Sequence, residues 1–471
     1  MEVNSQRYGV FNTLFLTDSY KISHHLQYPP GTTKIFSYFE SRGGKWDKTV
    51  FFGLQVIMKK YLSGVVVTQE MIDEADQFFR EHFGRNIFNR EGWELIVTRH
   101  GGKLPVLIRA VPEGSVVSVH NVLFTVENTD PELAWITNYL ETLLVQVWYP
   151  MTVATNSWWC KQVIRAYLET TADNTDSLQF KLHDFGYRGV SSVESAGLGG
   201  AAHLVNFLGT DTLAGIVTSK QCYPGAGMPG LSIPATEHST MTSWGREGEK
   251  EAVEHVMENI SGGGLAVVVD SYDIWNMLEN IVGGEMKSLV ENRAQAGGFL
   301  VVRPDSGDPK IVLLKVFDIL GDKFGYSVNS KGYKMLPDCI RVIQGDGVSY
   351  DSIGDILESV TAAGWSAENL TFGSGGALLQ RLDRDTQKCA YKCSYAVVDG
   401  VEREVFKDPV TDPGKRSKKG RLVLVRDGGG WSTVREEERG GRDDELVTVF
   451  QDGDIVREWT WQQVRDRADS G

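Results

Sequence analysis

Several residue patterns that mark secreted, metal-binding and membrane proteins are missing from this sequence. Only five of its 471 residues are cysteine, and no two of them form a CxxC pair. Neither a disulfide framework nor a structural zinc site is therefore expected, and free thiols in a reducing compartment are the favoured interpretation. No apolar run approaches the ~18 residues of a membrane span, and residues 1–10 lack the segments of a secretory signal. We expect a cytoplasmic protein that does not enter membranes.

An excess of basic residues is also missing. The formal net charge is −14, which argues against a nucleic-acid-binding protein because phosphate backbones are held by surplus lysine and arginine. A small anionic ligand is not excluded, since a local basic pocket can lie on an acidic surface. Histidine spacings such as HExxH are absent, so no protein-ligated metal site is expected.

What is present is a chain long enough for two or three domains. Residues 68–84 have the apolar spacing of a helix behind a threonine cap, and residues 104–130 indicate strands broken by turns. Residues 131–169 predict a long helix interrupted near Pro150. The Gly-rich charged segment 427–445 predicts an exposed hairpin or a flexible loop, and no chemistry is assigned to it.

From about residue 180 the sequence repeats one unit: a short apolar strand, a cluster of glycine, acid and serine, and then a helical stretch. Alternating strands and helices imply a parallel sheet, and six or seven such units predict an irregular (β/α) barrel. An open doubly wound sheet is the alternative, and the lack of a GxGxxG turn weakens it as a dinucleotide-binding fold. The strand ends of the repeat lie at 181–186, 209–216, 231–239, 265–273, 299–308, 341–349 and 369–379.

Polar residues follow these strands, and in a barrel that edge holds the active site. The stretch GSGGALLQ (373–380) leads from a strand into a helix, so its glycines would let backbone N–H groups approach a phosphate. A tight turn without a ligand is the other interpretation. Asp270, Asp305 and Asp346 end three separate strands. Carboxylates that converge in this way suit ribose hydroxyls or a Mg²⁺ ion that also contacts phosphate.

A histidine and a mixed aromatic and basic stretch complete this edge. His238 stands at a further strand end, and we interpret it as functional rather than structural. Residues 183–192, HDFGYRGVSS, place Phe185 and Arg188 beside glycines, which combines a ring face with a cation. Together these features require a ligand with a phosphate, a ribose, a second cluster of negative charge and a flat ring. A phosphoribosyl donor with an aromatic base meets all four requirements.

Longer motifs run in order along almost the whole chain. They are TDSYKISH (17–24), YPPGTTKIFSYFESR (28–42), HDFGYRGVSS (183–192), VNFLGTDTLAG (205–215), EHST (237–240), DSYDIWN (270–276), RPDSG (303–307), QGDGV (344–348), FGSGGALLQ (372–380) and FKDPVTDPGKRSKKGR (406–421). In these motifs the sequence resembles the nicotinamide phosphoribosyltransferase family. The resemblance implies transfer of a phosphoribosyl group from phosphoribosyl pyrophosphate to nicotinamide, giving nicotinamide mononucleotide and pyrophosphate in NAD salvage.

The resemblance also implies an architecture. It predicts an α/β fold with an irregular barrel at residues 179–389 and a second α+β domain formed from both chain ends, 1–178 and 390–471. It further implies a homodimer in which each active site contains residues of both subunits. Arg42, Lys392 and Lys415 match phosphate contacts made across that interface.

Single residues take roles from the same resemblance. Phe185 matches the aromatic that stacks on the pyridine ring, and Tyr20 matches the tyrosine that covers the other face from the partner subunit. Asp211 matches the acid near the carboxamide, which would accept a hydrogen bond from an amide and repel the carboxylate of nicotinate. Arg188 and Arg303 match phosphate and pyrophosphate contacts. Further expected substrate-binding residues are Ser232, Asp270, Asp305, Gly345, Asp346, Gly375, Gly376 and Arg384.

Catalysis is expected to involve His238, Arg303 and Asp305. His238 matches the histidine that the family phosphorylates with ATP, so the resemblance implies ATP hydrolysis loosely coupled to synthesis, and Mg²⁺ bound mainly through substrate phosphates. Nicotinate phosphoribosyltransferase is the nearest alternative. A binding protein that keeps the fold without turnover, and a barrel lyase or aldolase with a Schiff-base lysine, are alternatives of other classes. No lysine stands at the strand ends apart from Lys181 and Lys392 near strand starts, which disfavours the last of them.

Overall fold

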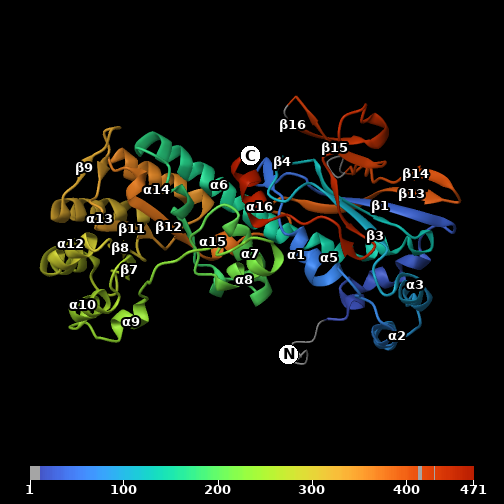
Figure 1. Cartoon of the computed structure of the whole chain (residues 1–471), viewed down its shortest axis with the longest axis horizontal. Coiled ribbons are helices and arrows are strands. Elements are labelled where there is room, and N and C mark those ends of the chain that lie inside the picture. The colour runs from blue at the N-terminus through green and yellow to red at the C-terminus, as the bar shows by residue number, and fades with distance from the viewer. Residues whose placement is uncertain (1–10, 412–415, 429) are drawn as a thin grey trace. The chain divides into compact units, whose positions relative to one another are not determined.

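The computed structural model describes residues 11–411, 416–428 and 430–471, which form two compact units (Figure 1). Unit 1 consists of the described residues within 1–155, 220–226 and 383–471, and unit 2 consists of 156–219 and 227–382. Each unit is described by itself. The chain passes between the units at 155/156, 219/220, 226/227 and 382/383. The domain limits expected from the sequence, 178/179 and 389/390, stay a prediction.

Unit 1 is built on a seven-stranded antiparallel sheet with the order β14-β13-β1-β5-β3-β17-β18. Its three central strands, β1, β5 and β3, come from the N-terminal part of the sequence, and two C-terminal strands lie on each side of them. The two parts join where β1 pairs with β13 along most of its length, with Tyr38 opposite Lys392. The expected second domain made from both chain ends is therefore confirmed. The strands are β1 Thr32–Ser41, β3 Val106–Ala110, β5 Val122–Asn128, β13 Cys389–Val398, β14 Val401–Glu404, β17 Val447–Gln451 and β18 Asp454–Ile455.

The centre of this sheet is apolar, which explains why these segments pair. Every residue of β5 is buried, and the rings of Phe39 and Phe124 stack on neighbouring strands with their centroids 4.8 Å apart. Such aromatic pairs add to the free energy gained from burying their apolar surface. The helices of unit 1 are α1 Leu54–Ile57, α2 Gln69–Phe83, α3 Arg90–His100, α4 Ile136–Tyr139, α5 Glu141–Val145 and α16 Trp461–Asp469, with short 3₁₀ helices η1 Thr13–Phe15, η2 Ser19–Leu26, η4 Pro131–Leu133 and η10 Glu436–Glu438 and a π-helical segment Met58–Leu62.

Two expectations for this unit are confirmed and one is corrected. Helix α2 begins behind Thr68, whose hydroxyl accepts from the Met71 N–H. A hairpin pairs β15 Leu422–Asp427 with β16 Gly430–Arg435, and its second strand lies in the segment 427–445, for which a hairpin was one expectation. A further short pair joins β2 Lys48–Val50 to β4 Val116–Ser118. The long helix expected over 131–169, with an interruption near Pro150, is corrected: α4 and α5 are separate short helices, and α6, Trp148–Thr171, continues through Pro150. Pro150 lies in the first turn of α6, where proline needs no N–H bond.

Unit 2 contains a five-stranded parallel sheet with the order β6-β12-β11-β8-β7. Isolated parallel bridges join Asp184 to Thr210, Gly209 to Leu231 and Ala235 to Ala266. They connect the edge strands β6 and β7 through the segments 209–210 and 231–235, so the predicted irregular (β/α) barrel is confirmed. The strands are β6 Leu182–Asp184, β7 Gly264–Val268, β8 Phe299–Arg303, β11 Ile340–Gln344 and β12 Leu370–Ser374, with a separate pair β9 Ser327–Val328 and β10 Lys334–Met335.

Helices follow the strands of unit 2 in the order expected of repeated strand–helix units, and α13 packs on α14 beside the sheet (Figure 1). They are α7 Val193–Leu204, α8 Leu213–Cys222, α9 His238–Thr242, α10 Glu249–Asn259, α11 Ile274–Asn276, α12 Lys287–Gln295, α13 Pro309–Phe324, α14 Tyr350–Ala362 and α15 Gly376–Leu379, with 3₁₀ helices η5 Leu178–Phe180, η6 Tyr187–Gly189 and η8 Ala367–Asn369 and a π-helical segment Met277–Glu285.

Two further observations concern the whole described chain. All five cysteines are free thiols and four of them are buried, which confirms the absence of a disulfide framework. None of the helices in the described residues combines the length and apolar character that crossing a bilayer requires.

Candidate functional site

The carboxyl ends of the parallel strands in unit 2 carry most of the residues singled out by the sequence. Phe185 follows β6, Asp270 follows β7, Arg303 ends β8, Asp346 follows β11 and Gly375 follows β12. Because all five strands run in parallel, these residues lie at one edge of the sheet. This is the edge at which barrels hold their active sites.

A cavity of about 420 Å³ lies inside this barrel. Its inner part is apolar, formed by a small cluster of Ala266, Val301 and Ile343 from three neighbouring strands. His183, Asp211 and Ser232 supply its polar groups, and Phe185 lines it. An apolar chamber with a few polar groups grouped together is suited to a flat, uncharged ring that carries one polar substituent.

Phe185 lies flat against strand β12. A Cβ on Gly373 would fall 2.0 Å from the Phe185 ring, so only glycine at that position leaves room for the ring. The Phe185 N–H donates to the Ser374 carbonyl at 2.9 Å, and the ring lies 5.0 Å from the His183 ring. The aromatic face expected from the sequence is therefore fixed by main-chain and side-chain contacts on both neighbouring segments.

Asp211 is held by two hydrogen bonds to the same carboxylate oxygen. His183 Nε2 lies 2.9 Å from Asp211 Oδ1, and Ser232 Oγ donates to Oδ1 at 2.5 Å. Burial alone would raise the pKa of Asp211, but the bonds from His183 and Ser232 and the charge of Arg303 lower it below its ordinary value. Asp211 is thus an ionised acceptor, and Oδ2 accepts no hydrogen bond from the described residues.

Asp184 fixes the two sides of the cavity to one another. Its Oδ1 accepts the Gly186 N–H at 2.7 Å, its carbonyl accepts the Asp211 N–H at 2.9 Å, and its N–H donates to Gly209. The side chain is fully buried. Burial raises the pKa of Asp184 to about 6, despite the opposing hydrogen bonds from the Gly186 N–H and the Thr212 side chain. The side chain of Asp184 thus holds the turn after Phe185, and its main chain holds Asp211, so this one residue links the two sides.

His238 belongs to an acidic network at the same edge. Its Nε2 lies 3.0 Å from Asp270 Oδ1, and its Nδ1 lies 4.0 Å from Asp305 Oδ2. The other oxygen of Asp270 accepts from Ser306 Oγ at 2.5 Å and from the Asp305 N–H at 3.2 Å. Asp270 is buried while about half of the His238 side chain is exposed. The network holds one imidazole nitrogen on Asp270 and leaves the other ring nitrogen without a hydrogen bond from the described residues.

Arg303 offers an unused hydrogen-bond donor beside this network. Its Nη2 donates to the Thr236 carbonyl at 3.2 Å, whereas Nε is buried and has no acceptor in the described part of the chain. Gly345 keeps the neighbouring space open, because a Cβ there would lie 3.0 Å from Asp305 Oδ1. Burial raises the pKa of Asp305, and Asp270 adds to this effect while Arg303 opposes it. A buried guanidinium N–H without an acceptor is a natural position for an anionic oxygen.

The glycine loop after β12 completes the edge. Gly375 precedes the short helix α15, and Gly376 has open space where a Cβ would be. A Cβ on Gly189 would lie 3.5 Å from the Gly376 backbone, so the 186–189 turn that carries Arg188 lies beside this loop. Arg188 itself is exposed. The structure thus brings the predicted phosphate loop and the predicted pyrophosphate contact together, while their roles stay predictions.

The remaining expected residues lie in unit 1. Burial lowers the pKa of Lys392, and the charges of Arg42, Arg384 and Lys407 lower it further, so these cations lie near one another. Arg42 is also bound to Glu40, with Nε 2.7 Å from Oε1. Tyr20 is largely exposed and lies 5.2 Å from the His24 ring. Lys415, expected to join this group, falls outside the described residues.

A metal site made by the protein alone is not found in the described chain. No group of three or more His, Cys, Asp or Glu side chains is placed to hold a metal ion there. Asp270 and Asp305 are nevertheless hard oxygen donors of the kind that Mg²⁺ uses together with phosphate oxygens. These carboxylates fit an ion that is bound mainly through a substrate.

Sequence reasoning missed the contacts that orient the site. The bond between His183 and Asp211 was not foreseen. Gly373, the partner of the Phe185 ring, and Ser306, a donor to Asp270, were also missed. The alternation of the strands could have identified the apolar wall of Val301 and Ile343. No local sequence pattern indicates the contact of Gly373 with the Phe185 ring or of Ser306 with Asp270, because each partner is distant in the sequence.

Comparison with solved structures defines the fold. The structure is similar to the crystal structure of nicotinate-nucleotide pyrophosphorylase from Pyrococcus furiosus, with a TM-score of 0.60 and 15% identity over 99% of this chain and 97% of that chain. The sequence model described as the nicotinate phosphoribosyltransferase (NAPRTase) family matches residues 180–454, more than half of the chain. The class is therefore that of the phosphoribosyltransferases.

Closer relatives define the family. The model described as the nicotinamide phosphoribosyltransferase N-terminal domain matches residues 12–108. A nicotinamide phosphoribosyltransferase of Xanthomonas campestris pv. campestris (strain 8004) is 52% identical over 98% of this chain and 98% of the relative. One of Acinetobacter baylyi is 32% identical over 97% of each. The chain belongs to the nicotinamide phosphoribosyltransferase family.

Proposed function

We propose that this protein is an enzyme that transfers the phosphoribosyl group of phosphoribosyl pyrophosphate to nicotinamide in NAD salvage. The products are nicotinamide mononucleotide and pyrophosphate. Full-length relatives that carry this name support the proposal. The observation that carries the choice of base is the ionised Asp211 in the wall of the barrel cavity.

Asp211 accounts for a preference for the amide. His183 and Ser232 occupy Oδ1, so Oδ2 can accept a hydrogen bond from a carboxamide NH₂ group. The carboxylate of nicotinate would instead lie against a carboxylate, and two like charges in a partly buried cavity repel each other strongly. Nicotinate phosphoribosyltransferase, the alternative activity, would need a cation or a neutral donor at this position.

The chemistry requires positioning more than proton transfer. The bond between the ribose anomeric carbon and pyrophosphate breaks, and its electron pair leaves with the pyrophosphate. The pyridine nitrogen already carries a lone pair and forms the new C–N bond, so no general base is needed. The Arg303 Nε–H, the Arg188 guanidinium and the glycine amides at 375–376 are the donors available to the departing charge.

Mg²⁺ is part of the proposal as an ion bound mainly through the phosphates of the donor. Its chemistry is to neutralise charge on the leaving pyrophosphate. Asp270 and Asp305 are placed to orient the ion's water ligands or the ribose hydroxyls. Burial raises the pKa of Asp305, and the charge of Asp270 adds to that effect. The protein's proposed contribution to binding this ion is the position of the Asp270 and Asp305 carboxyl groups.

ATP is proposed as an activating co-substrate that phosphorylates His238. When Nε2–H donates to Asp270 at 3.0 Å, Nδ1 carries the ring's lone pair, which can attack the γ-phosphorus while ADP leaves with the electron pair of the broken bond. The Asp270 side chain is buried, and a carboxyl group that accepts from the second ring nitrogen orients the imidazole for this attack. Hydrolysis of the phosphohistidine would then couple loosely to synthesis.

The active unit is proposed to be a homodimer in the cytoplasm. The second aromatic face and further phosphate contacts are proposed to come from Tyr20, Arg42, Arg384, Lys392 and Lys415. All of these residues except Arg384 are proposed to reach the site across the subunit interface. The proposal is supported by the cationic cluster around Lys392. Mixing the inactive variants Tyr20→Ala and Arg303→Ala tests it, since a mixed dimer would contain one intact site. Recovery of activity on mixing supports shared sites, and a mixture as inactive as its parents contradicts them.

The experiment for the activity is direct. The full-length protein is incubated with nicotinamide, phosphoribosyl pyrophosphate and Mg²⁺, with and without ATP, and the mononucleotide is followed by chromatography. The proposal expects synthesis without ATP and faster synthesis with it. Absence of the mononucleotide under both conditions would refute the activity, and equal rates would refute the role of ATP alone.

A further inference from the structure

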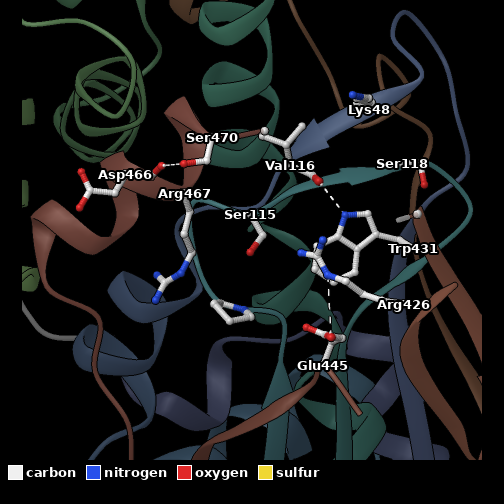
Figure 2. A pocket seen from close by; sticks show the side chains of 13 residues that line it. Lys48, Ser115, Val116, Ser118, Arg426, Trp431, Glu445, Asp466, Arg467 and Ser470 are labelled. Carbon is white, nitrogen blue, oxygen red and sulfur yellow. Dashed lines mark hydrogen bonds and ion pairs between the residues drawn. The ribbon is translucent and has the colours of Figure 1, made fainter. Parts of the chain in front are cut away.

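Unit 1 contains a second cavity, of about 640 Å³, to which none of the residues of the barrel site contributes. It lies between strand β4, the β15–β16 hairpin and helix α16 (Figure 2). The second strand of the hairpin belongs to the segment 427–445, to which the sequence assigned no role. Its place is fixed, because Thr433 Oγ1 accepts the Val122 N–H at 2.8 Å and donates to Asn121 Oδ1 at 3.0 Å. The cavity is therefore a preformed feature of the unit.

One wall of the cavity is a stack of a guanidinium on an indole. Arg426 lies over the Trp431 ring at 4.0 Å from its centroid, and Trp431 Nε1 donates to the Val116 carbonyl at 2.8 Å. The indole is thus oriented by the main chain, and the guanidinium is oriented by the indole. Half of the Arg426 side chain remains exposed, and Glu445 lies 3.8 Å from its Nε. A second flat ring can extend such a stack at low entropic cost.

The opposite wall carries a cation that is fixed but not neutralised. Arg467 lies over the Trp459 ring at 4.2 Å and donates from Nη1 to the Glu113 carbonyl at 3.0 Å. It forms no ion pair within the described chain. Burial lowers the pKa of Arg467, although the carboxyls of Glu113 and Asp466 oppose that effect. Its remaining N–H groups can receive an anionic oxygen, and charge-assisted bonds of this kind are the stronger class.

The polar groups between the walls complete the pattern. In Figure 2, Ser115 lies between Arg467 on one side and Trp431 with Arg426 on the other, while the Asp466 carboxylate points away from this space. Asp466 accepts from Gln462 at 2.7 Å instead. From Glu445 to Arg467 the cavity thus presents an acceptor, a ring stack, a hydroxyl and a cation.

We propose that this cavity binds a nucleoside monophosphate whose base carries an exocyclic amine. The base would extend the Arg426–Trp431 stack and donate its amine to Glu445, the ribose would lie near Ser115, and the phosphate would bind Arg467. The volume is within the roughly 300–1,000 Å³ typical of small-molecule sites. A bare anion would leave the stack unused. A nucleic-acid strand would meet the acids Glu445 and Asp466 on a chain of net charge −14.

The test uses adenosine 5′-monophosphate and the full-length protein in isothermal titration. The same titration is made with Phe185→Ala, which removes the aromatic wall of the barrel cavity and touches no residue of the second cavity. An unchanged dissociation constant in that variant separates this site from the barrel site and from the proposed activity. We expect saturable binding of adenosine monophosphate. Adenosine, which lacks the phosphate, and inorganic phosphate, which lacks the ring, should each bind at least about tenfold more weakly.

Variants locate the site. Arg467→Gln and Arg426→Gln should each weaken binding about tenfold or more, whereas Arg457→Gln should not, since Arg457 is an exposed arginine 5.6 Å from the same Trp459 ring and outside the cavity. Inosine monophosphate, with a keto group in place of the amine, should bind more weakly than the adenosine nucleotide, and Glu445→Gln should remove that difference.

Three results would overturn the proposal. One is the absence of saturable binding of adenosine monophosphate to the wild type or to Phe185→Ala. Another is an unchanged dissociation constant in both Arg467→Gln and Arg426→Gln when circular dichroism shows that they are folded. The third is equal affinity of the wild type for the two nucleotides, which would remove the role given to Glu445 and with it the amine-bearing base.

Discussion

His183 Nε2 lies 2.9 Å from Oδ1 of Asp211, and through this contact a histidine of strand β6 keeps an acid of the 209–211 segment charged and correctly oriented. Ser232 donates to the same oxygen. The pKa of Asp211 stays below its ordinary value although burial opposes this. The relationship makes the cavity polar at one point with a negative charge, and it is the physical basis for selecting an amide over an acid.

Replacing Asp211 by asparagine should relax that selection. The uncharged amide of Asp211→Asn no longer repels nicotinate, so the ratio of kcat/KM for nicotinamide to that for nicotinate should fall about tenfold or more. Ser232→Ala is the matched control, because it removes one donor to Asp211 and leaves the charge in place. Steady-state kinetics with both bases measures the ratio. An unchanged ratio in Asp211→Asn would contradict the amide-reading role.

Removing Arg188 should impair turnover without unfolding the protein. The side chain is exposed at the 187–189 turn, so its loss costs little stability, while a donor to the leaving pyrophosphate disappears. We expect kcat of Arg188→Ala to fall roughly 10²–10³-fold and the thermal transition to stay in place. Arg80→Ala, on helix α2 of unit 1, serves as the control for loss of an exposed arginine. Near-normal turnover would exclude Arg188 from leaving-group binding.

Replacing His238 should abolish the stimulation by ATP while synthesis without ATP continues. His238→Ala is expected to keep synthesis in the absence of ATP and to lose both the stimulation and the ATP-dependent phosphate label on the protein. Asp270→Asn should weaken the label in the same direction, because Asp270 accepts from His238 Nε2. Rates with and without ATP, together with a base-stable and acid-labile phosphate on the wild type, are the readouts. Full stimulation in His238→Ala would disprove the phosphohistidine.

Asp184 should make stability depend on pH. Its pKa is raised from 3.8 to about 6 by burial, so the folded state binds this proton more tightly than the unfolded state. The stabilising contribution is therefore complete below about pH 4 and is lost as the pH rises through about 6. At roughly 1.4 kcal/mol per unit, the loss amounts to roughly 3 kcal/mol.

Asp184→Asn isolates this effect because the amide cannot ionise. The free energy of unfolding of the wild type, relative to that of the variant, should fall between pH 4 and pH 7. Urea unfolding at several pH values across that range measures the difference. A difference that is independent of pH would show that the Asp184 carboxyl does not titrate there.

Local sequence patterns were enough to predict the barrel, its active edge and helix α2. Apolar runs that end in Asp270, Asp305 or Asp346 are local, and parallel strands bring their carboxyl ends to one edge, so the barrel and its active edge could be predicted. The helix α2 followed from its spacing and its threonine cap. Resemblance of longer motifs added the roles of single residues to that framework.

Contacts between distant segments could not be read in the same way. Gly373 is needed because the Phe185 ring crosses it, and nothing near Gly373 in the sequence indicates that ring. The segment 131–169 forms α4, α5 and the start of α6 because its apolar residues pack on the antiparallel sheet of unit 1, and tertiary packing overrides the helical propensity of the whole stretch. Likewise, nothing in the sequence of the hairpin at 422–435 indicates that the Trp431 indole lies beside β4, where it bonds to the Val116 carbonyl.

One competition experiment tests most directly whether Asp211 selects nicotinamide over nicotinate. The wild-type protein receives nicotinamide and nicotinate at equal concentration with phosphoribosyl pyrophosphate and Mg²⁺, and the two mononucleotides are separated and quantified at early times. An ionised Asp211 in the cavity predicts that nicotinamide mononucleotide is the dominant product. If nicotinate mononucleotide dominated instead, the selection of the amide by Asp211 would be contradicted.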